Sequence, residues 1–173
     1  MTKFLFLDAA RTAGNICIAK ELNKVHQSLY RETAGNILLD VSPHIFSLSE
    51  DSEFSNWYFE NGWGKSWGLV IIAKMSFEDC WIHFRRFLII KTDDKRELYF
   101  RFYDPRVLKI FLPTCDKNQI LEFFGPVESF ICEGDTKEEA IRFWHQNGEL
   151  KQEVLPVEKI FGNIVIPATD NLS

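Results

Sequence analysis

The apolar run LVIIA, at residues 69–73, limits the fold of this chain more than any other stretch. A continuous apolar run of this length, rich in β-branched side chains, is typical of a buried strand. The stretch KFLFL at residues 3–7 has the same character and predicts a second buried strand. With 173 residues, of which 46% are hydrophobic, the chain can bury a core around such strands, so we expect an ordinary folded domain.

Helical patterns alternate with further strand patterns along the chain. Aromatic residues at helical spacing predict a helix that is capped by Ser49 or Asp51 and ends at Gly62, and another helix over residues 76–87. Less regular patterns predict a helix over residues 8–24 and a short one over 107–112. Asp116 begins a further helix, and its inward residues are expected to be Ile120, Leu121 and Phe124.

Strands are expected over residues 26–30, 44–48, 88–90, 98–104 and 128–132. In the strand over 98–104, Tyr99, Arg101 and Tyr103 would share one face, because side chains alternate along a strand. Asn147-Gly148 predicts a final hairpin. The predicted fold is α/β: a single compact domain with a mixed, partly antiparallel sheet flanked by short helices. We expect residues 1–134 to form the main domain, with residues 135–173 packed on it as a hairpin and a frayed tail.

The charge and the cysteine pattern exclude several classes of partner. A formal net charge of −5 argues against nucleic acid, because proteins usually meet phosphate backbones with clustered Lys and Arg. No apolar stretch approaches the ~20 residues of a membrane span, and no signal-peptide pattern opens the chain, so we expect a cytoplasmic protein without a membrane partner. The one metal-like spacing, Cys80-x-x-His83, has no second half, so we expect no metal and no cofactor.

Motifs of catalysis are also absent. The sequence contains no G-x-S-x-G elbow, phosphate loop, dinucleotide fingerprint or H-E-x-x-H motif, and its histidines are scattered. The stretch GWGKSWG at residues 62–68 superficially resembles the end of a phosphate loop. However, Phe59 stands where the first glycine belongs, and the segment precedes a strand instead of following one. We interpret it as a tight turn lined by aromatic residues, and we expect the protein not to be an enzyme.

The stretch RFYDPR, residues 101–106, allows two interpretations. In the structural one, Asp104 caps a helix that begins at Pro105, while Arg101 or Arg106 pairs with nearby carboxylates or carbonyls. In the functional one, the arginines anchor a protein partner, because Arg, Trp and Tyr dominate binding hot spots. We favour the structural interpretation.

Five blocks of the sequence carry a family resemblance. In chain order these blocks are FLFLDAAR, GWGKSWG, HFRRFL, RFYDPRVLKIFLP and FFGPVESF. Together they resemble the type VI secretion effector chaperones. This family, whose members are also called adaptors, has been described as a domain of unknown function. The resemblance spans residues 4–131 and implies a non-enzymatic cytoplasmic α/β module. Such a module binds a secreted effector protein and helps to mount it on the spike, the VgrG or PAAR tip. Many relatives carry a longer C-terminal lobe than this chain.

The signature positions of that family, which we take as candidate partner-binding residues, fall on Trp63, Gly64, Trp67, Gly68, Arg86, Arg101, Tyr103, Asp104 and Arg106. Two other functions stay open: an immunity protein that binds and neutralises a cognate toxin, and an enzyme with an unrecognised site. An immunity protein inhibits its partner, whereas an adaptor leaves the partner's activity intact. An enzyme should show a group with a shifted pKa in a deep pocket.

Overall fold

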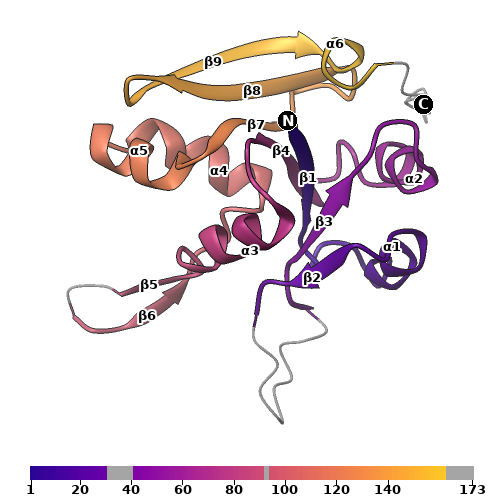
Figure 1. Ribbon diagram of the computed structural model, residues 1–173, viewed down its shortest axis with the longest axis horizontal. Helices are drawn as coiled ribbons and strands as arrows, with labels where there is room; N and C mark the ends of the chain where they lie inside the picture. The colour runs from indigo at the N-terminus through magenta and orange to yellow at the C-terminus, as the bar shows by residue number, and fades with distance from the viewer. Residues whose placement is uncertain (31–40, 92–93, 163–173) are drawn as a thin grey trace, which may run out of the picture.

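One central sheet organises the protein. The computed structural model describes residues 1–30, 41–91 and 94–162. Seven strands form this sheet in the order β2-β3-β1-β4-β7-β8-β9 (Figure 1). They are β1 (Thr2–Leu7), β2 (His26–Ser28), β3 (His44–Leu48), β4 (Gly68–Ala73), β7 (Val127–Glu133), β8 (Glu139–Gln146) and β9 (Glu149–Pro156).

The pairings confirm the α/β fold, and every strand pair in the described part of the chain is antiparallel. The two apolar runs lie at the centre, because β1 pairs with β4 and Leu7 lies opposite Gly68. On its other edge β4 pairs with β7, with Val70 opposite Ile131. The two runs are therefore neighbouring central strands.

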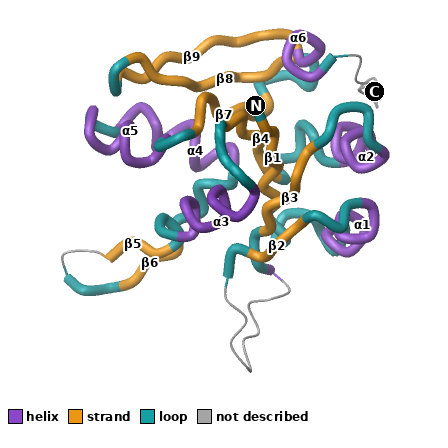
Figure 2. The backbone as a smooth tube through the Cα atoms, in the orientation of Figure 1, coloured by secondary structure: helices purple, strands orange, loops and turns teal. Residues whose placement is uncertain are grey.

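Helices cover both faces of the sheet, so the domain has three layers (Figure 2). Side chains alternate along β1: Phe4 and Phe6 enter one core, while Leu5 and Leu7 enter the other. The first core is closed by α3 (Phe77–Arg85), α4 (Pro105–Phe111), a 3₁₀ turn (Leu112–Thr114) and α5 (Lys117–Phe124). The second is closed by α1 (Ile16–Leu22), α2 (Glu53–Asn61) and α6 (Val157–Phe161).

Several helix boundaries and faces differ from the sequence predictions. Helix α2 is capped by Ser52, whose hydroxyl accepts a hydrogen bond from the Ser55 N–H at 3.1 Å, and not by Ser49 or Asp51. Helix α1 begins only at Ile16, after a series of turns. In α5 the buried residues are Ile120, Phe123 and Phe124, so the assignment of Leu121 to the inner face was wrong. The aromatic ring of Phe123 fills that place in the core.

The predicted strand over residues 98–104 is only partly correct. β5 (Ile89–Lys91) and β6 (Glu97–Tyr99) form the expected hairpin, but as a separate two-stranded sheet that projects from the body (Figure 1). The chain then turns, with the Asp104 N–H donating to the Arg101 carbonyl at 3.0 Å. Phe102 and Tyr103 are consequently both buried. The shared strand face of Tyr99, Arg101 and Tyr103 does not exist.

The final hairpin is confirmed and extends the central sheet. β8 and β9 pair along eight positions, and Asn147 and Gly148 form the turn with φ of 53° and 81°. The boundary expected at Gly134 falls between β7 and β8, which are hydrogen-bonded neighbours. The last residues, expected to be frayed, lie outside the described residues. No helix within the described ranges is long and apolar enough to cross a membrane.

Candidate functional site

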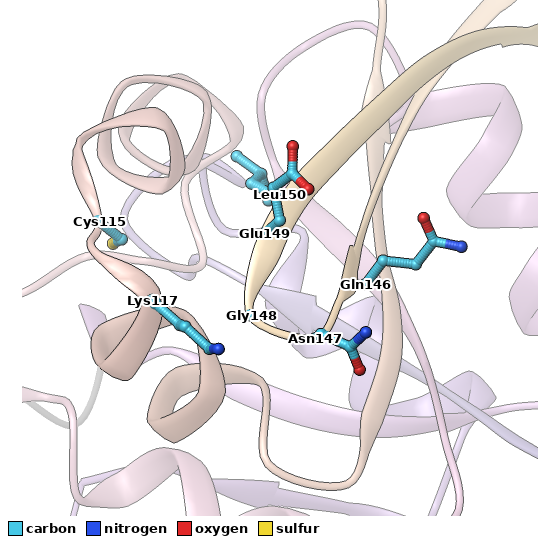
Figure 3. A pocket seen from close by; sticks show the side chains of 7 residues that line it. All are labelled: Cys115, Lys117, Gln146, Asn147, Gly148, Glu149 and Leu150. Atoms are coloured by element: carbon cyan, nitrogen blue, oxygen red, sulfur yellow. The ribbon is translucent and has the colours of Figure 1, made fainter.

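An open pocket of about 730 Å³ lies between the start of α5 and the β8–β9 turn (Figure 3). None of the candidate residues from the sequence lines it. Its potential nucleophile is Cys115, but burial and the neighbouring Asp116 raise the pKa of this thiol. The reactive thiolate is therefore disfavoured. In the part of the chain that the structure describes, no group of three His, Cys, Asp or Glu residues is placed to hold a metal ion.

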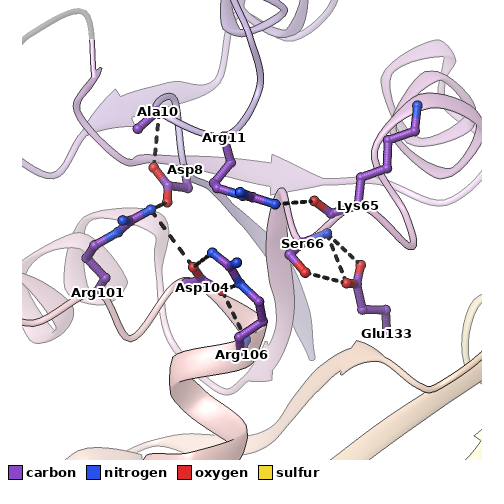
Figure 4. Close-up of polar contacts among 9 residues, drawn as sticks. All are labelled: Asp8, Ala10, Arg11, Lys65, Ser66, Arg101, Asp104, Arg106 and Glu133. Carbon is purple, nitrogen blue, oxygen red and sulfur yellow. Dashed lines mark hydrogen bonds and ion pairs between the residues drawn. The ribbon is translucent and has the colours of Figure 1, made fainter.

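All the candidate residues except Arg86 gather instead at one end of the central strands. The register that places Leu7 opposite Gly68 brings the turn after β1 against GWGKSWG, and the Asp8 N–H donates to the Trp67 carbonyl at 2.8 Å. The end of β7 contributes Glu133, and the RFYDPR corner joins from the helical layer (Figure 4). We call this assembly of two turns, one strand end and the RFYDPR corner the charged corner.

The GWGKSWG turn encloses the carboxylate of Glu133. The Gly64 N–H donates to Oε2 at 2.8 Å, and Ser66 donates to Oε1 through its N–H at 2.9 Å and its hydroxyl at 2.7 Å. Gly64 and Ser66 have φ of 80° and 55°, which turns both N–H groups toward one point. The turn is an anion-binding nest that is filled by a side chain of this same protein.

Trp63, Trp67 and Gly68 of this turn are structural. The Trp63 ring is buried, and its Nε1–H donates to the Lys137 carbonyl at 2.9 Å. Trp67 is buried in the same core. At Gly68 an added Cβ would overlap the carbonyl oxygen of Phe6, so only glycine allows β1 and β4 to approach so closely. The interpretation as a tight, aromatic-lined turn is confirmed.

RFYDPR is the helix start that the structural interpretation predicted. Asp104 precedes α4, its Oδ1 accepts from the Arg106 N–H at 3.0 Å, and Pro105 is the first helical residue. The Arg106 side chain returns to the same carboxylate through Nε at 3.0 Å and Nη2 at 2.7 Å. Burial alone would raise the pKa of Asp104, but the hydrogen bonds and charge of Arg106 outweigh burial and lower it.

Arg101 links this corner to the turn after β1. It donates to Asp8 Oδ2, and its Nη2 lies 3.9 Å from Asp104 Oδ2. The hydrogen bond to Asp8 raises the pKa of Arg101. Both carboxylates are almost fully buried, with Asp8 1% and Asp104 2% exposed. The result is an alternating chain of charges, Asp8–Arg101–Asp104–Arg106, with the carboxylates inside.

Two predicted site residues behave differently from the rest. Tyr103 is buried, its hydroxyl lies 3.4 Å from that of Tyr30, and burial raises its pKa. Arg86 is exposed at the end of α3 with its guanidinium over the Phe87 ring, and no contact joins it to the charged corner among the described residues. Arg86 is therefore separate from the other candidates.

Three residues of the charged corner were not singled out from the sequence: Asp8, Arg11 and Glu133. The sequence contains a feature that could have indicated two of them, Asp8 and Glu133. Asp8 follows the buried strand KFLFL directly, and Glu133 ends the strand VESFICE, so each places a carboxylate at the end of a buried element. A charge in such a position needs a partner, because an unpaired charge is costly to bury.

The protein is an α/β domain in which helices cover both faces of one sheet. Most of its candidate residues lie in the charged corner and hold one end of the central strands in place. Residues 3–122 match the family model described as "Domain of unknown function (DUF4123)", and the chain belongs to this family. No curated protein and no solved structure matches the chain.

Proposed function

We propose that this protein is a non-enzymatic adaptor that binds a type VI secretion effector and assists its loading onto the VgrG or PAAR spike. The observation that carries the proposal is membership of the DUF4123 family over residues 3–122. It agrees with the sequence resemblance to effector chaperones, whose blocks all lie within residues 4–131. The partners are a secreted effector and a spike protein.

The geometry supports a binding role more than a catalytic one. The polar groups of the charged corner are paired with one another, and the Glu133 carboxylate fills the nest that could otherwise bind a phosphate. Cys115, in the open pocket, is held toward its protonated form. The Cys115 thiol donates to the Phe111 carbonyl and not to a general base, which covalent catalysis requires. In the charged corner the Ser66 hydroxyl does lie beside the Glu133 carboxylate, but this carboxylate is buried and also accepts from the Gly64 and Ser66 N–H groups, so the pair is closed within the fold.

A pull-down from the bacterium that encodes the protein tests the proposal. The tagged protein should recover an effector or spike protein encoded near its own gene, identified by mass spectrometry. The recovered effector should keep its toxic activity when it is assayed in the complex. Recovery of neither protein would overturn the proposal, and inhibition of the effector would identify an immunity protein instead.

A further inference from the structure

The charged corner exposes cations above buried carboxylates. Asp8, Asp104 and Glu133 are at most 8% exposed. The arginine side chains paired with the first two are much more open, at 41% for Arg101 and 55% for Arg106. The corner therefore presents guanidinium groups to the solvent and keeps their counter-charges beneath.

Two further cations belong to this surface. Arg11 is exposed in the turn after β1, and its Nη2 donates to the Lys65 carbonyl at 3.3 Å (Figure 4). The exposed Lys65 extends from the GWGKSWG turn, with its Nζ 5.6 Å from the centre of the Trp67 ring. We name these four residues the basic surface: Arg11, Lys65, Arg101 and Arg106. Three separate chain segments build it, and the network beneath holds them together.

The arginines are held in place before any partner arrives. Asp104 binds Nε and Nη2 of Arg106, which fixes the plane of the guanidinium, and no hydrogen bond joins its Nη1 to another of the described residues. Arg101 is held less firmly, by one hydrogen bond from Nη2 to Asp8 and a longer ion pair with Asp104. A side chain that is already ordered loses less entropy on binding, and the planar guanidinium fork matches a carboxylate with two hydrogen bonds.

The charge of the whole chain selects the kind of partner. The protein carries a net charge of −5. A long polyanion such as duplex DNA would extend past the four cations and be repelled by the negative charge of the rest of the protein. A short segment with a few carboxylates would meet only the four cations. Asp135 and Glu138, which are exposed in the turn after β7, form no ion pair with these cations in the described part of the chain.

We propose that the basic surface is the docking site for an acidic segment, rich in Asp and Glu, of the effector that the protein carries. This inference rests on the proposed function and adds to it a location and a partner chemistry. Complementary charge of this kind speeds encounter and selects the partner, and it makes binding sensitive to salt.

The test uses Arg11→Glu with Lys65→Glu, because neither side chain neutralises a buried carboxylate. The matched control is Lys91→Glu with Lys117→Glu, which makes the same change in net charge at exposed positions on β5 and α5. Affinity for the effector encoded beside the gene is measured by calorimetry from about 0.05 to about 0.5 M sodium chloride. Thermal unfolding of each variant shows that the fold is retained.

We expect the first variant to bind the effector at least about tenfold more weakly at low salt and with a flatter salt dependence, while the control binds like the wild type. Equal affinity and equal salt dependence for the first variant would overturn the inference, as would an equal loss in the control. In either case effector binding by the wild type leaves the adaptor function standing. Absence of wild-type binding would instead reject the adaptor function itself.

Discussion

Arg101 and Asp8 are 93 positions apart in the sequence and form an ion pair in which the carboxylate is almost completely buried. This pair joins the end of β1 to the corner that starts α4. It therefore ties the central sheet to the helical layer that covers one of its faces. The residues that most resemble a functional motif first serve the fold, and the exposed atoms of the same arginines are what a partner can reach.

Removing Arg101 should destabilise the fold. In Arg101→Ala, Asp8 keeps its buried carboxylate and loses its cation. We expect the free energy of unfolding to fall by about 2 kcal/mol in a urea titration, less than the roughly 3–5 of a fully buried pair, because Arg101 is 41% exposed. Arg86→Ala is the control and should change stability by less than about 0.5 kcal/mol. Equal stability of the two variants would show that the ion pair does not support the fold.

Asp104 combines two roles that substitutions can separate. Asp104→Ala removes both the cap of α4 and the partner of Arg106, whereas Asp104→Asn keeps an oxygen that can cap. Losing a cap costs about 1 kcal/mol, so the alanine variant should have the lower melting temperature of the two. Effector binding should weaken mainly through misfolding. Unchanged thermal unfolding with abolished effector binding would instead show that Asp104 serves binding, through the ordering of Arg106 or by direct contact.

The two glycines of GWGKSWG should differ sharply on substitution by alanine. At Gly64 the φ of 80° strains an alanine, but the nearest obstacle is the flexible side chain of Lys137, so we expect a loss of about 1–2 kcal/mol. At Gly68 the obstacle is the backbone of Phe6 in a central strand. We expect Gly68→Ala to give little soluble protein, which expression and circular dichroism would reveal. A Gly68→Ala variant as stable as Gly64→Ala would contradict the close approach of β1 and β4.

His44 should make the fold sensitive to mild acid. Burial, with a smaller contribution from the charge of Lys20, lowers its pKa to about 4. In the unfolded chain it titrates near ~6.5, so between the two values the unfolded state binds more protons and stability falls as the pH falls. The loss is up to about 3 kcal/mol and is complete near pH ~4. His44→Gln should flatten the dependence of unfolding free energy on pH in this window, and an unchanged slope would refute the assignment.

Local signals allowed much of the fold to be predicted. Four features depend only on residues within a few positions of one another. They are the strand LVIIA, the helix start at Asp104-Pro105, the helix start at Asp116 and the turn at Asn147-Gly148. The alternating pattern gave a wrong prediction over much of residues 98–104, because a turn that buries two successive aromatic residues has no periodic pattern. The burial of Phe123 instead of Leu121 depends on the shape of the surrounding core.

The charged corner could be predicted only in part. The capping of α4 by Asp104 is local and followed from the sequence. The pairing of Arg101 with Asp8, and of Ser66 with Glu133 across 67 positions, depends on strand order and register. No spacing along the chain encodes those two relationships, so the basic surface emerges only once the sheet is assembled.

Secretion of the effector tests the adaptor function most directly. The gene for this protein is deleted in its source organism, and the proposed effector is measured in cells and in the culture medium, with a second effector of the same secretion system as the control. We expect the neighbouring effector to disappear from the medium, the second effector to be secreted normally, and a copy of the wild-type gene to restore secretion. Undiminished secretion of the neighbouring effector in the deletion strain would contradict the proposed function.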